Sequence, residues 1–107
     1  MKAILCKNFG TPEQLVLQNL PPLTPSPKEV VIQVLACGVN FPDLLMIQNL
    51  YQFKPALPFS PGGEVAGIIQ SVGDEVKNLK PGQRVLALTG WGGFAEEVLV
   101  NSLQVMP

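Results

Sequence analysis

The chain has 107 residues, of which 47% are hydrophobic and 14% are charged, and its formal net charge at pH 7 is −1. This length allows one domain with a hydrophobic core, and the apolar content excludes a disordered chain. Seven scattered basic residues argue against a nucleic-acid-binding surface, and no apolar run reaches the ~18 residues of a membrane-spanning helix.

The charged fraction is well below the ~25% typical of soluble domains. Either another domain or subunit covers part of the surface, or the domain is simply rich in apolar residues. No cleavable leader is predicted at the N-terminus, because residues 1–5 run directly into strand-like sequence. Cys6 and Cys37 are expected to be reduced thiols of a cytoplasmic protein, although a disulfide between them stays open.

Short β-strands separated by turn sequences are predicted in the first third of the chain, over residues 2–7 and 15–18. Four prolines between positions 21 and 27 predict a stiff extended connection, because proline cannot donate to a β-ladder. The strongest predicted strand covers residues 29–36. Its Val, Ile and Leu residues lie on both faces, which predicts a strand covered on both sides for much of its length.

A short helix is predicted to begin after Asn40 and to end near Asn49. Asparagine is a favoured N-cap, proline is tolerated in the first turn at Pro42, and Asp43 occupies the third helical position. This arrangement resembles a capping box.

Strands are predicted in the second half of the chain over residues 64–72, 83–88 and 94–100, with a further edge segment at 103–106. Gly67 lies inside the first of them and predicts a bend or a close approach of another backbone segment. About seven short strands, one short helix and eleven prolines indicate a mainly β fold, a closed or partly closed barrel.

Two motifs, Ala-Cys-Gly-Val-Asn-Phe-Pro-Asp at 36–43 and Pro-Gly-Gly-Glu at 61–64, resemble catalytic-domain motifs of medium-chain alcohol dehydrogenases. Asn40 and Gly63 stand where zinc-using members carry Cys and His. Because the chain has two cysteines and no histidine, it cannot assemble the usual zinc ligands. Pro-Gly-Gln-Arg-Val at 81–85 and Gly-Gly-Phe-Ala-Glu at 92–96 extend the resemblance in order and spacing. The chain therefore resembles zinc-free medium-chain reductases of the quinone oxidoreductase type.

The resemblance implies a GroES-like, partly open β-barrel with one or two short helices, in which residues 1–107 form the N-terminal portion of a catalytic domain. The family's Rossmann domain is absent from this chain, because no Gly-x-Gly-x-x-Gly motif occurs. The family implies NADPH as cofactor, no zinc, and hydride transfer to a quinone or an α,β-unsaturated carbonyl. We expect a cytoplasmic, homodimeric full-length enzyme acting on a small molecule, and an inactive fragment.

Five positions are expected to form the site. Asn40 and Tyr51 match family positions near the nicotinamide and the substrate oxygen, so they are predicted to be catalytic and cofactor-binding residues. Asn40 is also the helix N-cap, and Tyr51 has the alternative of packing at the rim. Phe41, Ile47 and Trp91 are predicted to line the substrate pocket, with packing as the alternative for the two aromatic residues. No metal ligand is predicted.

Two other readings stay open. An enoyl-thioester reductase would share these motifs but would need a groove for an acyl carrier. A stand-alone GroES-like binding or assembly module would share the barrel, although the sequence has no long Gly-rich loop of the kind that engages a chaperonin.

Overall fold

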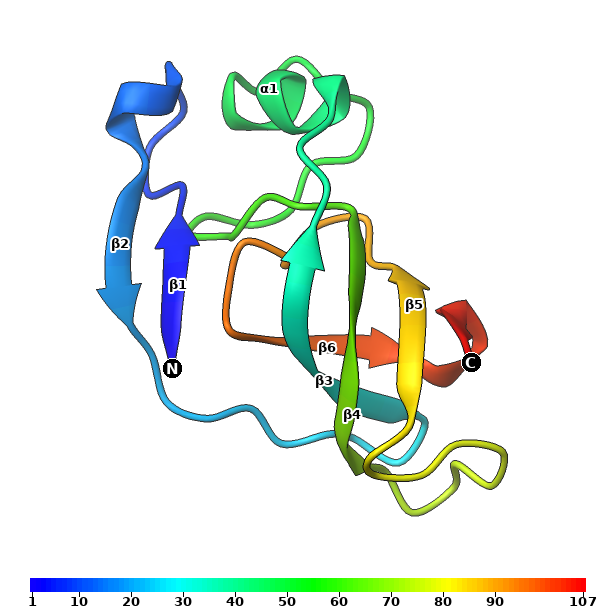
Figure 1. The fold of residues 1–107 in the computed structure, drawn as a ribbon. Coiled ribbons are helices and arrows are strands. Elements are labelled where there is room, and N and C mark those ends of the chain that lie inside the picture. The colour runs from blue at the N-terminus through cyan, green and yellow to red at the C-terminus, as the bar shows by residue number, and fades with distance from the viewer.

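The computed structural model describes residues 1–107, and β-strands dominate it (Figure 1). The seven strands are β1 (Lys2–Leu5), β2 (Val16–Asn19), β3 (Glu29–Cys37), β4 (Glu64–Val72), β5 (Arg84–Leu88), β6 (Glu97–Asn101) and β7 (Val105–Met106). The helical segments are α1 (Phe41–Ile47) and the 3-10 turns η1 (Pro12–Gln14) and η2 (Ser102–Gln104). β1 and β2 form a two-stranded sheet, and the other five form an antiparallel sheet in the order β6-β3-β4-β5-β7.

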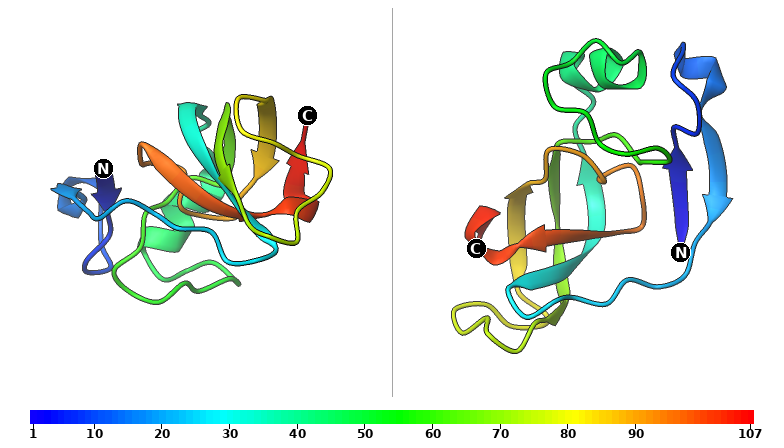
Figure 2. Two further views of the ribbon diagram at one scale, coloured as in Figure 1. Left: turned by 90° about the horizontal axis from the view of Figure 1, so that it is seen from below. Right: turned by 180° about the vertical axis from the view of Figure 1, so that it is seen from behind.

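The five-stranded sheet curls into a half-barrel, with β6 crossing the far side of the bent strand β3 (Figures 1 and 2). β3 bends where its pairing with β4 shifts register, between Val31 and Ile32 and again between Val34 and Ala36. Such irregularities increase the local twist of a strand, so that one bent strand can pair with neighbours in two differently oriented parts of a curled sheet. The structure confirms the mainly β, partly open barrel with one short α-helix.

The core lies inside this curl. Val30, Val31 and Ile32 are fully buried, so the first half of β3 is covered on both faces as predicted. The second half is not, because the Leu35 side chain is 64% exposed. A separate, smaller cluster below α1 contains Cys6, Met46, Ile47 and Phe59. The helix is therefore held by its own group of apolar contacts at one end of the barrel.

Most predicted elements are found, with differences at their ends. β1 ends at Leu5, two residues early, and the predicted strand 94–100 begins only at Glu97. The predicted edge segment 103–106 is a strand only at its last two residues. Its beginning forms η2 instead, because the Asn101 side-chain oxygen accepts the N–H of Leu103 (2.9 Å) and turns the chain.

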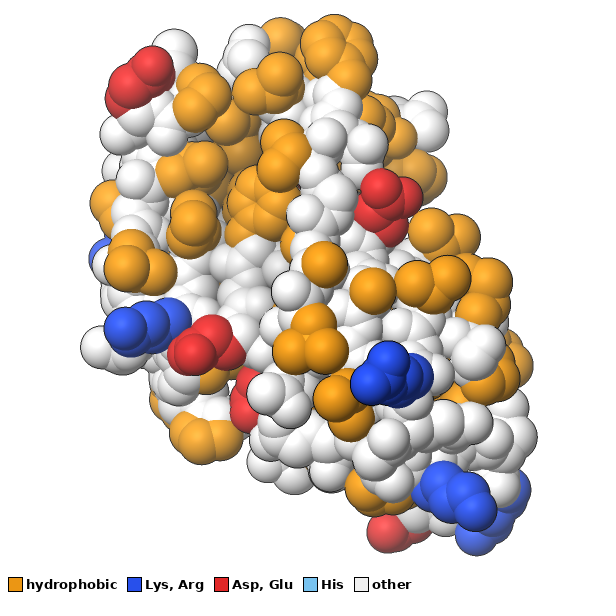
Figure 3. Space-filling model, in the orientation of Figure 1, with side chains coloured by type: hydrophobic (Ala, Val, Ile, Leu, Met, Phe, Trp, Pro, Cys, Tyr) orange, Lys and Arg blue, Asp and Glu red, His pale blue; other side chains and the backbone are white.

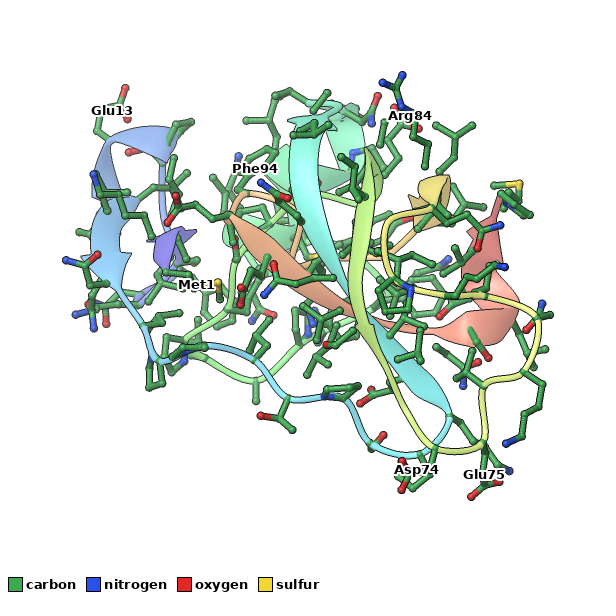
Figure 4. The ribbon with its side chains drawn as sticks, turned by 60° about the horizontal axis from the view of Figure 1, so that its bottom comes forward. Met1, Glu13, Asp74, Glu75, Arg84 and Phe94 are labelled. Atoms are coloured by element: carbon green, nitrogen blue, oxygen red, sulfur yellow. The ribbon has the colours of Figure 1, made fainter.

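Charged side chains lie at the periphery of the molecule. Glu13, Asp74, Glu75 and Arg84 project away from the sheet in Figure 4. Hydrophobic side chains cover much of the face shown in Figure 3. The low charged fraction thus corresponds to exposed apolar side chains, among them Leu86, Leu88 and Met106 on the outer face of the sheet. None of the helices has the length and apolar character needed to cross a bilayer.

Candidate functional site

The N-terminus of α1 is fixed by one buried carboxylate. The Asn40 N–H donates to Asp43 Oδ2 (2.8 Å), and the Gly62 N–H donates to Asp43 Oδ1 (3.1 Å). Asp43 is only 5% exposed, and both of its oxygens are engaged. This acid therefore supports the loop by accepting backbone N–H groups. Asp43 joins the start of the helix to the Pro-Gly-Gly loop nineteen residues later.

A cleft of about 430 Å³ opens between α1, the segment after it and the loop before β6. We call it the cleft throughout. Its ten lining residues are Asn40, Pro42, Asp43, Met46, Tyr51, Phe53, Gly63, Glu64, Gly90 and Trp91. Three of the five predicted site residues, Asn40, Tyr51 and Trp91, are therefore brought together from three separate segments.

Tyr51 joins the cleft to the hydrophobic cluster below α1. Its ring packs against that cluster and lies edge-on to Phe53, with ring centroids 5.8 Å apart. An aromatic pair in this geometry restricts both rings. The sequence analysis did not identify Phe53 as a site residue. The feature that could have indicated it is its position two residues after Tyr51. Glu64 also lines the cleft with an exposed side chain.

The other two predicted pocket residues lie elsewhere. Ile47 is 3% exposed and belongs to the buried cluster with Cys6, Met46 and Phe59. Phe41 is 69% exposed on the first turn of α1 and is not among the residues that line the cleft. The period of the helix explains why neither residue lines the cleft. Asp43 and Met46 lie on the side of α1 that lines the cleft, whereas Ile47 belongs to the buried cluster and Phe41 is turned toward solvent.

Both cysteine thiols are free and lie close to this region of the fold. Burial, and next the negative charge of Asp43, raise the pKa of the Cys37 thiol above its ordinary value. Burial also raises the pKa of Cys6. Neither thiol is therefore activated as a nucleophile at neutral pH.

These pKa shifts predict how stability depends on pH. A thiol with a higher pKa in the folded chain contributes stability below its unfolded pKa, and this contribution is lost as the pH rises through the folded pKa. We expect the free energy of unfolding, measured in urea, to decrease from neutral pH to strongly alkaline pH. In Cys37→Ala the decrease should be smaller, and an identical decrease would contradict the assignment.

The lining of the cleft offers polar and aromatic groups but no cation. It contains an amide, a phenol and an indole, which can bind a planar ring with polar edges. It contains no Lys or Arg, so the cleft offers no cationic group for a diphosphate. No three His, Cys, Asp or Glu side chains are grouped so that they could hold a metal ion.

Residues 26–107 match the family model of the alcohol dehydrogenase GroES-like domain. Quinone oxidoreductase of Rattus norvegicus is 47% identical over 102 residues, which are 92% of this chain and 31% of that protein. The synaptic vesicle membrane protein VAT-1 homolog of Rattus norvegicus is 41% identical over 106 residues, covering 97% of this chain and 26% of that protein.

The fold is also found in solved structures. The structure of Escherichia coli quinone oxidoreductase complexed with NADPH superposes with a TM-score of 0.92 at 30% identity, covering 99% of this chain and 32% of that one. The chain thus spans about a third or less of the length of these relatives. It belongs to the alcohol dehydrogenase GroES-like domain family, within the medium-chain dehydrogenase/reductase superfamily, and is of the quinone oxidoreductase type.

Proposed function

We propose that residues 1–107 are the N-terminal catalytic domain of a zinc-independent, NADPH-dependent oxidoreductase that transfers hydride to a quinone or an α,β-unsaturated carbonyl. The observation that carries the proposal is the meeting of Asn40, Tyr51 and Trp91 in one cleft. The relatives named quinone oxidoreductase and the neighbour complexed with NADPH support it.

NADPH, when bound, would supply a hydride to the acceptor. Negative charge would develop on the acceptor oxygen as the hydride arrives, and a proton from solvent would then complete the reduction. The Tyr51 hydroxyl and the Asn40 side-chain amide would each donate a hydrogen bond to that oxygen. These bonds would stabilise the charged oxygen of the transition state more than the neutral carbonyl oxygen of the bound acceptor. Trp91 would stack on the planar acceptor ring. The diphosphate would bind outside the cleft, because the cleft has no cation.

Zinc independence rests on the chemistry of the cleft lining. Asn40 and Gly63 both line the cleft at the two positions where zinc-using members supply ligands. Neither residue offers a thiolate or an imidazole, and the Asp43 oxygens are already bonded to two backbone N–H groups. We expect a metal chelator to leave the activity of the full-length enzyme unchanged.

A homodimeric full-length enzyme and a cytoplasmic location stay predictions. So does the inactivity of residues 1–107 alone, for which NADPH consumption by the isolated domain is the measurement.

The proposed role of Tyr51 predicts a kinetic effect in the full-length protein that carries this chain. Tyr51→Phe should lower kcat by about a hundredfold, with a smaller change in KM, because the lost hydrogen bond forms mainly in the transition state. The measurement is NADPH consumption with menadione and with methyl vinyl ketone as acceptors. Gln52→Ala, at an exposed neighbour that does not line the cleft, is the matched control.

Comparing the two variants separates loss of the Tyr51 hydroxyl from a general disturbance of this segment. If Tyr51→Phe retains full kcat, the hydroxyl has no role in the reaction. If the unaltered protein consumes NADPH with neither acceptor, the proposed function is wrong.

A further inference from the structure

A second pocket, with a volume of about 440 Å³, lies beside the cleft, between β1, β6 and the segment that follows Phe53. We call it the apolar pocket. Eleven of its sixteen lining residues are hydrophobic. Backbone bridges between Ala3 and Ala95 and between Cys6 and Phe59 hold its walls together. Figure 2 shows the same segments running close to β1.

Trp91 lines both hollows, so the cleft and the apolar pocket adjoin at this residue. One segment also contributes to both: Tyr51 and Phe53 line the cleft, and Ala56 and Phe59 line the apolar pocket. The Trp91 loop is held in place on both sides, because Gly90 donates its N–H to the Gly63 carbonyl (3.3 Å) and Gly92 to the Ser60 carbonyl (2.6 Å). The two hollows therefore adjoin at a residue whose backbone neighbours are held on both sides.

The two charged groups that line the apolar pocket are hydrogen-bonded to protein partners. Its one carboxylate, Glu97, accepts the Leu23 N–H at Oε1 (3.1 Å) and the Gln70 amide at Oε2 (2.8 Å). The amino group of Met1 donates to the Leu20 carbonyl (2.6 Å). Both groups keep their charge, but apolar residues make up most of the lining, which favours hydrocarbon.

We propose that the apolar pocket binds the hydrocarbon tail of a substrate whose carbonyl head lies in the cleft. The proposal rests on the proposed function, and it specifies the substrate class as quinones or unsaturated carbonyl compounds with a long unbranched or prenyl-like chain. The polar head reaches Asn40 and Tyr51, and the tail passes Trp91 into the apolar pocket.

A series of methyl ketones, from methyl propyl ketone to methyl heptyl ketone, tests the proposal on residues 1–107. These probes do not react with thiols and differ only in tail length. Trp91 is the one tryptophan of the unaltered chain, so its indole N–H signal in a ¹⁵N-correlation NMR spectrum is unambiguous there. In the two variants that add a tryptophan, binding is followed at the backbone signals. A dispersed spectrum first shows that the chain is folded.

We expect the affinity to rise by up to about fourfold for each added methylene, since each buried methylene contributes about that factor. The Trp91 indole signal should shift with every ketone. Backbone signals at Ala56 and Leu99 should shift only with the longer ketones, and the signals of Asn40 and Tyr51 should shift throughout.

A filled pocket gives the matched comparison. Ala56→Trp places a large side chain at an exposed loop position that lines the apolar pocket, and Gln52→Trp places the same side chain nearby, outside both hollows. Ala56→Trp should abolish the dependence on chain length and leave the binding of methyl propyl ketone unchanged. Gln52→Trp should behave as the unaltered chain does.

Each outcome decides between the two proposals. If the NMR signals of the cleft shift but the affinity does not depend on chain length, the proposal for the apolar pocket is wrong and the proposed function stands. Shifts in the apolar pocket without any at Asn40 or Tyr51 overturn the idea that one ligand occupies both hollows. A chain-length effect that persists in Ala56→Trp places the tail elsewhere and also overturns the proposal.

Discussion

Replacing Gly67 with valine is expected to lower the free energy of unfolding by about 4 kcal/mol, which is most of the stability of a domain this small. Gly67 is buried in the middle of β4, where a Cβ atom would overlap the Gln33 carbonyl oxygen of β3 and lie 2.8 Å from Ile32 Cγ2. The obstacle is backbone, and Gln33 is paired with β4 on one side and β6 on the other. It cannot move without opening the sheet. The midpoint and slope of a urea unfolding curve measure the loss.

Ala66→Val is the control for this prediction. Ala66 precedes Gly67 in the same strand but lies half-buried on the outer face, so one valine there should change the free energy of unfolding by less than about 1 kcal/mol. Equal stability of the two variants would show that the close approach of β3 and β4 is not required.

Replacing Asp43 with alanine is expected to lower the free energy of unfolding by about 3 kcal/mol. The carboxylate is the hydrogen-bond acceptor for the N–H groups of Asn40 and Gly62, and the Gly62 N–H is buried. Without the carboxylate, both donors lose their partners. Asp43→Asn should have an intermediate effect. The asparagine oxygen still accepts one backbone N–H, but its NH₂ group replaces the second oxygen and faces the other backbone N–H, so two donors meet.

Chemical denaturation of the three proteins measures this ranking. Asp74→Ala, at an exposed turn position, is the control and should change stability by less than about 0.5 kcal/mol. If Asp43→Ala were as stable as the unaltered chain, Asp43 would not be what holds the helix to the loop.

Local sequence signals determined most of the fold. The strand at residues 64–72 and the start of the helix after Asn40 were predicted at the residues where the structure has them. Both depend on local chemistry, namely the period of the apolar residues and the capping of a helix end. Gly67 likewise indicated a close backbone approach, and the structure shows that its neighbour is the Gln33 carbonyl. The family motifs were also contained in the sequence, because they are defined by residue type and spacing.

The tertiary structure decided where the chain bends and what its side chains face. The register shifts in β3 depend on partners distant in sequence, so the apolar period there predicted a straighter strand. The 3-10 turn at Ser102–Gln104 depends on a local bond to the Asn101 side chain, which the apolar period does not reveal. The same holds for Ile47, whose residue type suits a pocket and a core equally. Its place in the core follows from the packing of α1 against Cys6 and Phe59.

The candidate site divides in the same way. Asn40, Tyr51 and Trp91 could be named from the sequence, but their meeting in one cleft required the bond from Asp43 to Gly62 and the two backbone bonds of the Trp91 loop. The sequence by itself determined the family, the mainly β fold and the residue types at the two zinc-ligand positions, because these are properties of local pattern and composition. Only the tertiary structure decided that the polar cleft and the apolar pocket adjoin at Trp91. That arrangement arises from contacts among segments distant in sequence, such as the bridge between Ala3 and Ala95, and no local pattern encodes them.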